Sequence, residues 1–364
     1  MRKVTLVSIG PRGAMGYYIA CLANALVKHI KVKVVVADYM DEGYFDKNVE
    51  IIKIRTGTDR KRVLLTTFNF YNFYKIWKIF SRLDTDIIHF TSSHPWNFII
   101  SFFIKQPIVY TLHEPKVLFG ENPLLIFSYH LMIPRAKKII ILAKTFKKYL
   151  LKKNIPKEKI CQIPHGAFSF FRKWKRTDIK EEPMILFFGR IEKYKGIDYL
   201  LKALFLVKRE IPEIKLTIAG PGNLTPYLRD IKRPLHLEIL NSFILDPKVA
   251  ELFQRAKVIV LPYIEATQSG VPSIAYSFKK PVVATDVGGL SELIDDGKTG
   301  HLVKPKDAQA LAQALIKILK DDKKRKEMGE KGFEKMGREF SWEKIALKMV
   351  KVYEEVNSEC KLNK

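Results

Sequence analysis

Short apolar runs alternate with segments of helical periodicity along the whole chain. In the first half, the runs predict strands at Val4–Ile9, Val32–Ala37, Ile87–Phe90, Ile108–Leu112, Lys138–Leu142 and Ile160–Ile163. Between the strands, the spacing of apolar residues predicts helices over Tyr17–Lys28 and Phe68–Ser81. Strands that alternate with helices are typical of a parallel sheet covered by helices, so the pattern predicts an α/β fold.

A second series of the same kind fills the other half of the chain. Its predicted strands are Met184–Phe188, Lys215–Ala219, Leu237–Leu240, Lys257–Leu261 and Pro281–Ala284, and its helices include Ile197–Arg209, Ser273–Phe278 and Ala308–Lys320. The segment Phe168–Glu182 is charged and unpatterned, which indicates a linker and a domain boundary near residues 170–183. Ser341 is placed to be the N-cap of a last helix that runs to about Ser358.

Size and composition fit two folded domains. The chain has 364 residues, 47% of them hydrophobic, which is enough to bury two cores. Cys21, Cys161 and Cys360 are isolated, so they predict neither a disulfide framework nor a metal site and favour a reducing interior. No stretch approaches the ~18 uncharged residues of a spanning helix, so we expect a cytoplasmic protein that is not integral to a membrane.

The charge is strongly positive. Lys and Arg number 64 and Asp and Glu 38, a net charge of +26 at pH 7. Such an excess indicates an anionic partner, and nucleic acid, acidic lipid and phosphorylated substrates all fit it.

Glycines follow the first predicted strand and open the first helix. They are Gly10, Gly13 and Gly16, a Gly-x2-Gly-x2-Gly spacing that differs from the Gly-x-Gly-x2-Gly of dinucleotide-binding folds. Asp38 closes the second strand, where a ligand for an NAD ribose would stand. A dinucleotide site, a plain tight turn and a substrate-facing loop all remain open here.

The second strand series begins with cationic residues at a strand end. Met184–Phe188 leads into Gly189-Arg190, and Lys195-Gly196 follows before the next helix. The carboxyl ends of parallel strands form the crevice in which such sheets bind ligands, where Arg190 could fork two phosphate oxygens and Lys195 could add a point charge. The competing interpretation is that both are solvated surface cations.

Two further strand-to-helix turns lie downstream. The loop Pro262–Pro272 precedes the helix Ser273–Phe278, with Ser269 as a plausible N-cap and Pro272 suited to the first turn. A helix start rich in hydroxyls and N–H groups suits a diphosphate, although an ordinary capped turn reads the same way. Thr285–Glu292 is another glycine turn of this type.

Together these motifs resemble a known family. Gly189-Arg190 followed by Lys195-Gly196 resembles the Gly-Arg…Lys-Gly signature of retaining glycosyltransferase family 4, the group 1 glycosyltransferases. The segments Pro281–Ile294 and Asp296–Val303 continue the match, and Pro164-His165-Gly166 resembles the Pro-Asn-Gly turn of the family. The resemblance is strong over residues 160–340 and loose before them.

The resemblance implies the glycosyltransferase-B architecture of two Rossmann-like domains with the donor site in the cleft between them. It implies an N-terminal acceptor-side domain at residues 1–170, a C-terminal donor domain at 171–340, and a helix at 341–364 that returns to the N-terminal domain. The implied reaction moves a sugar, with retention, from a UDP- or GDP-linked donor to a hydroxyl acceptor in glycan, glycolipid or cell-surface polysaccharide synthesis. No cofactor and no metal are expected.

The resemblance also implies roles for single residues. Arg190 and Lys195 would bind the donor diphosphate, Gly13 would lie near the reacting centre, and His113 would lie near the transferred sugar. Glu265 matches the first of two glutamates that the family places eight positions apart, but the second position holds Ser273, or Ile274 if the match is anchored on Pro281. We therefore expect ribose recognition to differ, through Ser273 or a neighbour. The other expected donor contacts are Gly189, Thr267, Gln268, Ser269, Gly270 and Val271.

Two other classes stay open from the sequence. A basic nucleic-acid-binding protein is supported only by the charge, and the chain lacks a helix-turn-helix, zinc or RNA-binding signature. An NAD-dependent or nucleotide-sugar epimerase-like Rossmann enzyme is supported by Gly10 to Gly16 and Asp38. No carboxylate pair indicates glycoside hydrolysis.

The charge could also draw the protein to an anionic membrane surface that carries lipid-linked acceptors. The predicted helix over Phe68–Phe80 mixes aromatic residues with lysines and could lie at such an interface. The plainer interpretation, which we prefer at this stage, is a buried helix with a solvated lysine face.

Overall fold

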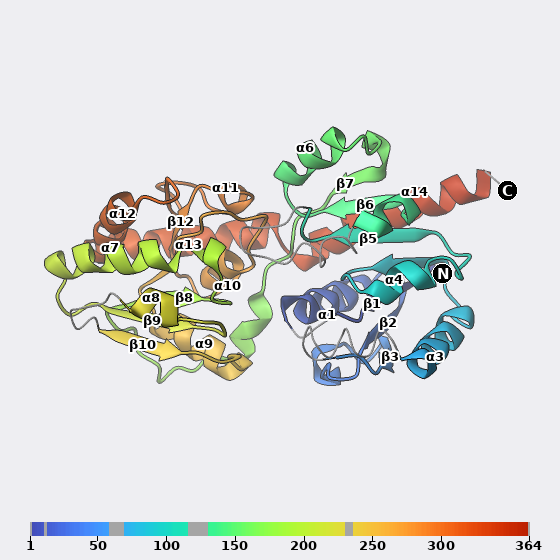
Figure 1. The fold of residues 1–364 in the computed structure, drawn as a ribbon, viewed down its shortest axis with the longest axis horizontal. Helices are drawn as coiled ribbons and strands as arrows, with labels where there is room; N and C mark the ends of the chain where they lie inside the picture. The colour runs from blue at the N-terminus through green and yellow to red at the C-terminus, as the bar shows by residue number, and fades with distance from the viewer. Residues whose placement is uncertain (1, 11–12, 58–68, 116–129, 230–235, 363–364) are drawn as a thin grey trace. The chain divides into compact units, whose positions relative to one another are not determined.

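A computed structural model of the chain describes residues 2–10, 13–57, 69–115, 130–229 and 236–362 (Figure 1). The chain divides into two compact units. The N-terminal unit consists of the described parts of Met1–Val117 and Asn122–Gly166 together with Phe340–Lys364, and the C-terminal unit contains Ala167–Glu339. Each unit holds one parallel sheet with helices around it, which confirms the α/β class and the two Rossmann-like domains.

The sheet of the N-terminal unit has seven parallel strands in the order β3-β2-β1-β4-β5-β6-β7. They are β1 (Lys3–Ser8), β2 (Lys31–Ala37), β3 (Glu50–Ile54), β4 (Ile87–Phe90), β5 (Ile108–Leu112), β6 (Lys138–Ile141) and β7 (Ile160–Gln162). The sequence did not predict β3, because this edge strand is only half-buried and lacks a continuous apolar run. Val4 of β1 pairs with Val32 on one side and Ile87 on the other, so the strand order reverses next to β1.

The helices of this unit are α1 (Ala14–Leu26), α3 (Phe70–Ser81), α4 (Pro95–Ile100), α6 (Lys144–Lys152) and α14 (Trp342–Leu362). The expectation that α3 is a buried helix is wrong. Phe70 is 88% exposed and Tyr71 65% exposed, whereas Ile76 and Phe80 face the core. Phe68, the predicted start of this helix, lies outside the described residues.

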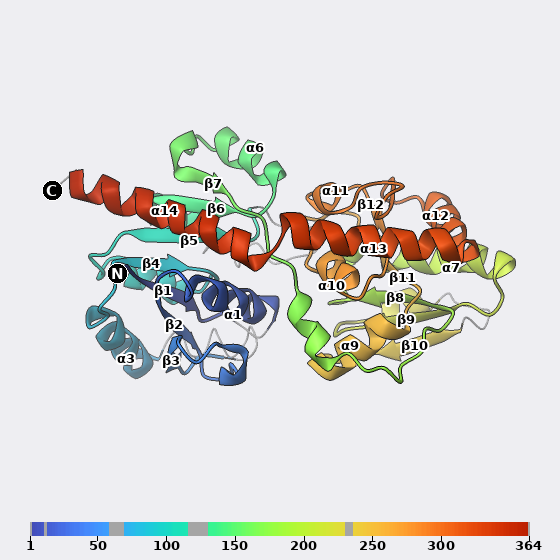
Figure 2. The same cartoon turned by 180° about the vertical axis from the view of Figure 1, so that it is seen from behind.

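The last helix returns to the N-terminal unit, as the predicted fold requires. Figure 2 shows α14 along this unit, where it packs against α1. The ring of His89 on β4 is hydrogen-bonded to Tyr353 of α14 and to Thr111 of β5, both at 2.7 Å. The Ser341 hydroxyl accepts the N–H of Lys344 at 3.4 Å, the bond expected of an N-cap.

The sheet of the C-terminal unit has six parallel strands in the order β10-β9-β8-β11-β12-β13. They are β8 (Met184–Phe188), β9 (Lys215–Ala219), β10 (Leu237–Leu240), β11 (Val258–Leu261), β12 (Val282–Thr285) and β13 (Gly300–Val303). The sequence did not predict β13, which begins with glycine. A Cβ on Gly300 would lie 2.0 Å from the Val282 carbonyl oxygen, so close strand packing requires the glycine.

The helices of the C-terminal unit lie around its sheet (Figure 1). They are α7 (Ile197–Glu210), α8 (Thr225–Leu228), α9 (Asp246–Arg255), α10 (Val271–Ser277), α11 (Leu290–Leu293), α12 (Ala308–Lys320) and α13 (Asp322–Glu339).

The segment Phe168–Glu182 is not the unpatterned linker that its charge suggested. Ser169–Trp174 forms a 3-10 helix that contacts α9 and α10. Phe168 and Phe171 are each 2% exposed, and the rings of Phe170 and Phe171 are 4.2 Å apart. Aromatic burial therefore anchors this segment to the C-terminal unit, although charged residues dominate its composition.

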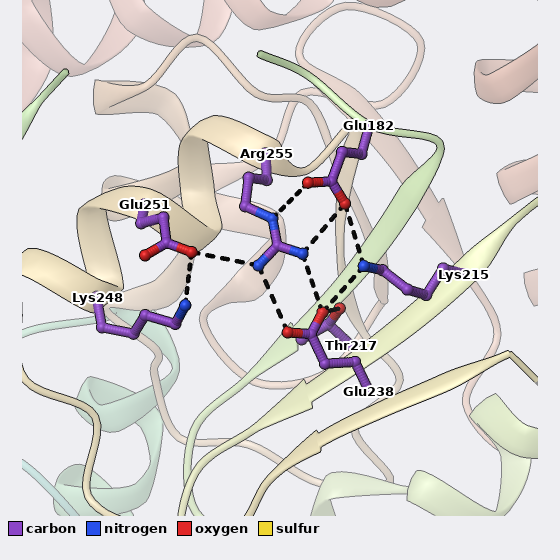
Figure 3. A network of polar contacts seen from close by, with 7 residues as sticks. All are labelled: Glu182, Lys215, Thr217, Glu238, Lys248, Glu251 and Arg255. Atoms are coloured by element: carbon purple, nitrogen blue, oxygen red, sulfur yellow. Dashed lines mark hydrogen bonds and ion pairs between the residues drawn. The ribbon is translucent and has the colours of Figure 1, made fainter. Parts of the chain in front are cut away.

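A polar network ties the strands of this unit together near their amino ends (Figure 3). Arg255 donates two hydrogen bonds to Glu182, at 2.7 and 3.1 Å, and two to Glu238, at 3.4 and 3.2 Å. Lys215 lies 3.1 Å from both carboxylates, and Glu251 accepts from Arg255 at 3.3 Å. The bonds from Arg255, with the one from Lys215, lower the pKa of Glu182 to about 2.

Candidate active site

The strand orders of both sheets define where a ligand is expected. Each order reverses once, between β1 and β4 in one sheet and between β8 and β11 in the other. At such a reversal the loops after the two strands diverge to opposite faces, which opens a crevice at the carboxyl edge. Gly10 and Gly13 follow β1, Gly189 and Arg190 follow β8, and the loop 262–270 follows β11. The sequence motifs therefore lie at the two positions that the topology selects.

The turn after β8 depends on glycine. Gly189 has a φ of 129°, a conformation that residues with a side chain rarely adopt. A Cβ on Gly220 would lie 2.1 Å from the Gly189 carbonyl oxygen, so the two loops touch through their backbones. This turn brings Arg190 to the carboxyl edge, where its side chain is 43% exposed and lies 3.5 Å from Glu192.

Lys195 lies beside the loop that follows β11. Its Nζ is 3.7 Å from the ring centroid of Tyr263, an arrangement typical of a cation–π contact. Gly196 has a φ of 65°, and a Cβ there would lie 2.0 Å from the Pro262 carbonyl oxygen, so only glycine allows this approach. The loop after β8 and the loop after β11 therefore meet at Lys195 and Tyr263.

Tyr263 lies under the Lys195 ammonium, and it is not among the site residues predicted from the sequence. The side chain is 1% exposed, and burial raises its pKa to about 12, while the positive charge of Arg190 acts in the opposite direction. Its hydroxyl is 3.4 Å from Ser269 Oγ. The signal in the sequence was its place just after a buried strand, inside the loop Pro262–Pro272.

The start of α10 differs from the prediction. The helix begins at Val271 with Gly270 as its N-cap, so the assignment of Ser269 as N-cap is wrong. Ser269 still accepts the N–H of Val271 at 3.3 Å, and Pro272 lies in the first turn as predicted. A Cβ on Gly270 would lie 2.4 Å from the Phe168 ring, so the glycine lets this ring pack against the start of the helix.

The loop after β11 is held from the other side by the turn after β12. The Gly289 N–H donates to the Thr267 carbonyl at 2.9 Å. Gly288 has a φ of 59°, and a Cβ there would lie 2.0 Å from the Ala266 carbonyl oxygen. Thr267 is buried, and Gln268 and Glu265 are half-buried in the same loop. Three loops thus pack into one rigid edge that carries the predicted donor contacts of this unit.

Ser273 has a structural partner. Its Oγ accepts the backbone N–H of Phe168 at 2.9 Å, and its side chain is buried. The hydroxyl therefore fastens the 3-10 segment to α10. A ribose contact through Ser273 stays a prediction.

His113 lies at the carboxyl end of β5 in the N-terminal unit. Its Nε2 is 2.8 Å from the Thr91 carbonyl oxygen, which can only accept, so Nε2 carries the proton and Nδ1 is the acceptor nitrogen. Burial, together with the neighbouring His165, lowers the pKa of His113 to about 3. Nδ1 is shielded from solvent and has no hydrogen-bond partner among the described residues. A neutral imidazole with a free acceptor fits a contact to a sugar hydroxyl.

A cluster of rings fixes the surroundings of His113. Tyr18 of α1 lies edge-on to His113 at 5.0 Å, and it also contacts His165 at 5.1 Å and Trp342 at 5.5 Å. A Cβ on Gly166 would lie 2.4 Å from the Trp342 indole, so the glycine of the Pro-His-Gly turn is needed to admit the start of α14. Burial lowers the pKa of His165 to about 4.

Gly13 is the N-cap residue of α1. Its backbone is extended, at a φ of 163°, and a Cβ there would meet none of the described residues within 4 Å. Neither backbone strain nor packing against the described residues therefore requires glycine at this position. Pro11 and Arg12 of the same motif lie outside the described residues.

Comparison with known proteins gives these sites a common frame. The family model for "Glycosyltransferase Family 4" matches residues 15–167, and the model for "Glycosyl transferases group 1" matches residues 170–335. The chain belongs to these glycosyltransferases. One relative is an uncharacterized glycosyltransferase of Methanocaldococcus jannaschii, 28% identical over 295 residues that cover 74% of this chain and 75% of the relative.

Two solved structures share the fold. Sucrose-phosphate synthase from Thermosynechococcus elongatus has a TM-score of 0.75 at 21% identity, over 99% of this chain and 100% of that one. The Anabaena protein HepE, solved with UDP and glucose, has a TM-score of 0.76 at 15% identity, over 97% of this chain and 100% of HepE. The glycosyltransferase therefore has the glycosyltransferase-B fold, and the family favours the transferase over the NAD-dependent and nucleic-acid-binding alternatives.

Metal-binding clusters and membrane-spanning helices are both absent from the described residues. Within the described residues, no group of three His, Cys, Asp or Glu side chains could hold a metal ion. None of the described helices has the length and apolar character needed to cross a bilayer.

Proposed function

We propose that the glycosyltransferase moves a sugar from a nucleoside diphosphate donor, UDP- or GDP-linked, to a hydroxyl acceptor with retention of the anomeric configuration. One observation carries the proposal: Lys195 lies over the Tyr263 ring where the loops after β8 and β11 meet, and Arg190 follows β8 at the same carboxyl edge. Two cations at the reversal point of a Rossmann-like sheet are suited to a pyrophosphate. The solved neighbour HepE carries UDP, which supports a nucleotide donor.

In the proposed reaction, the bond between the anomeric carbon and the β-phosphate oxygen breaks, and the electron pair stays on the phosphate. Arg190 and Lys195 stabilise this charge, so no metal is needed. The departing phosphate oxygen takes the proton of the acceptor hydroxyl, whose oxygen bonds to the anomeric carbon on the same face. Because both events occur on one face, the configuration is retained without a protein nucleophile.

The N-terminal unit supplies the sugar and acceptor side of this proposal. Nδ1 of His113 accepts a hydrogen bond from a hydroxyl of the transferred sugar, and Gly13 lies near the reacting groups. Glu265, Thr267, Gln268 and the N–H groups at Ser269 to Val271 hold the donor in the C-terminal unit. The acceptor belongs to glycan, glycolipid or surface polysaccharide synthesis, and a net charge of +26 suits work at the cytoplasmic face of an anionic membrane.

The test combines binding with product analysis. The purified protein is incubated with UDP- and GDP-sugars, and thermal stabilisation and nucleotide release are measured with and without EDTA. We expect one nucleotide to stabilise the protein, release that survives EDTA, and a product whose anomeric configuration, read by NMR, matches the donor. Stabilisation by NAD alone would contradict the donor assignment. An inverted product would contradict retention, and loss of activity in EDTA would contradict metal independence.

A further inference from the structure

Exposed apolar side chains are concentrated on one part of the N-terminal unit. Among the described residues, twelve large hydrophobic side chains are exposed, and seven of these lie on α3 or on and just after α4. The seven are Phe70, Tyr71, Tyr74, Trp77, Ile99, Phe102 and Phe103. Exposed apolar residues scattered singly need no explanation, whereas a cluster of aromatic residues marks an interaction surface.

The aromatic residues of α3 form a stripe. Phe70, Tyr74 and Trp77 follow the i, i+4, i+7 spacing of one helical face and are 88%, 55% and 37% exposed. A different face carries Ile76 and Phe80, which are buried in the core. The helix is thus anchored by one apolar face and presents a second one to the surroundings.

The stripe continues onto the neighbouring segment. The rings of Phe73 on α3 and Phe103, just after α4, are 6.4 Å apart in an edge-on arrangement. Phe102 is 57% exposed, and the Arg135 guanidinium lies 4.5 Å from its ring centroid. Arg135 also donates to the Ser101 carbonyl at 2.7 Å, which fixes the cation beside the ring. We call this set the α3–α4 face: the seven exposed residues named above.

A basic hollow adjoins the α3–α4 face. It has a volume of about 460 Å³ and lies between α3, the edge strand β3 and its neighbour β2; Figure 2 shows α3 beside β3. Its lining consists of Lys33, Glu50, Ile52, Lys75, Lys78, Ile79, Arg82 and Leu83. Four cations thus surround a partly apolar floor that contains a single carboxylate.

One of the four cations of the hollow is paired, and the other three form no ion pair among the described residues. Glu50 pairs with Lys33 at 3.0 Å. Within the part of the chain that the structure describes, Lys75, Lys78 and Arg82 form no ion pair. The Lys75 ammonium lies 4.4 Å from the Tyr71 ring centroid, so a cation of the hollow is in direct contact with a ring of the α3–α4 face.

We infer that the α3–α4 face docks on an anionic lipid bilayer, with the basic hollow facing the headgroups. Aromatic side chains with a polar edge are stable at the boundary between headgroups and acyl chains. Lysines beside them can lay their methylene stems on apolar surface and keep the ammonium among anionic headgroups. A helix with an apolar stripe and flanking cations lies in the plane of the interface, and none of the described helices is suited to cross it. This docking deepens the membrane part of the proposed function.

The test is co-sedimentation of the full chain with phosphatidylcholine vesicles, with and without phosphatidylglycerol. We expect the protein to bind the anionic vesicles at least about tenfold more strongly than the neutral ones. Binding to the anionic vesicles should weaken as the salt concentration rises. Phe70→Ser combined with Trp77→Ser, and separately Lys75→Glu with Lys78→Glu, should each weaken binding at least about tenfold. Thermal stabilisation by UDP or GDP should be unchanged in both variants.

Matched controls come from the rest of the surface. Phe243 and Leu347 are 41% and 46% exposed and lie outside the face, so Phe243→Ser with Leu347→Ser should bind vesicles like the wild type. Lys323 and Lys326 are exposed on α13, and Lys323→Glu with Lys326→Glu makes the same charge change in the other unit.

Each outcome of the vesicle experiment either supports the membrane-docking inference or overturns it. Failure of the wild type to bind anionic vesicles, or equal loss in the control variants, overturns the inference. A change in oligomeric state on Phe70→Ser with Trp77→Ser, with vesicle binding intact, would assign the face to a second copy of the chain instead. Vesicle binding without any nucleotide effect would keep the docking surface and overturn the donor proposal.

Discussion

The two ends of the sheet in the C-terminal unit both carry an arginine, and the two arginines are held differently. Arg255, near the amino ends of the strands, has a side chain that is 15% exposed and bonded to Glu182, Glu238 and Glu251 (Figure 3). Arg190, at the carboxyl ends, is 43% exposed and lies 3.5 Å from Glu192.

The difference separates a cation that stabilises the fold from one that can bind a ligand. The guanidinium of Arg255 is shared among three carboxylates, which leaves little affinity for a further anion. An exposed arginine with a long ion pair can exchange that contact for a phosphate at little cost, since such pairs contribute little to stability. The residue type is the same in the two cases, and the surrounding carboxylates separate the two roles.

The largest effect should come from replacing the cationic side chains at the carboxyl edge with alanine. Arg190→Ala and Lys195→Ala should each lower turnover by on the order of 10²–10³, because a preorganised charge at the leaving group is lost. The melting temperature should stay at the wild-type value. Lys193→Ala, an exposed cation of the same turn, is the matched control and should retain activity. Near-wild-type turnover in both site variants would remove the assignment.

Removing the Arg255 side chain, at the amino edge of the sheet, should lower stability and leave turnover unchanged. Arg255→Ala leaves Glu182 and Glu238 facing each other, and we expect a loss of about 1–3 kcal/mol in the free energy of unfolding, measured in urea. Turnover of the folded protein should not change. Arg176→Ala, which removes an exposed ion pair with Asp178, should leave stability unaltered. A loss of turnover in Arg255→Ala without a loss of stability would contradict the comparison.

His113, at the carboxyl edge of the sheet in the N-terminal unit, extends the comparison to a neutral side chain. His113→Ala should lower kcat about tenfold, the effect of one lost hydrogen bond to the sugar. Because burial lowers the pKa of His113 to about 3, the wild-type rate should show no inflection from this group between about pH 5 and pH 8. His29→Ala, away from this cluster, is the control. An inflection near pH 6.5 that disappears in His113→Ala would show that the ring titrates in this range.

The smallest expected effect is a pH dependence of stability from the amino-edge network. The pKa of Glu182 is about 2 in the folded protein, against an ordinary value of 4.5. A lowered pKa contributes stability above pH 4.5, and this contribution is lost as the pH falls from 4.5 towards 2. Between about pH 5 and pH 3, the wild type should lose more unfolding free energy than Glu182→Gln. Equal losses in both would show that the network does not act through this carboxylate.

Much of the fold was readable from local patterns. The strands at Met184–Phe188, Lys215–Ala219 and Ile108–Leu112 have the predicted bounds, because each is a short apolar run between turn residues. The edge strands β3 and β13 were missed, since one is half-exposed and the other begins with glycine. Burial against a neighbouring strand, which no local window contains, is what makes these segments strands.

For the site, the sequence determined which residue types follow which strands: Gly189 and Arg190 after β8, Ser269 and Gly270 after β11, and His113 after β5. It could not determine that Lys195 rests on Tyr263, that Ser273 fastens Phe168, or that the aromatic residues of α3 face outward. Strand ends follow from hydrophobic runs along the chain. Partners, exposure and pKa values depend on contacts between residues far apart in sequence, and only the tertiary structure decides those.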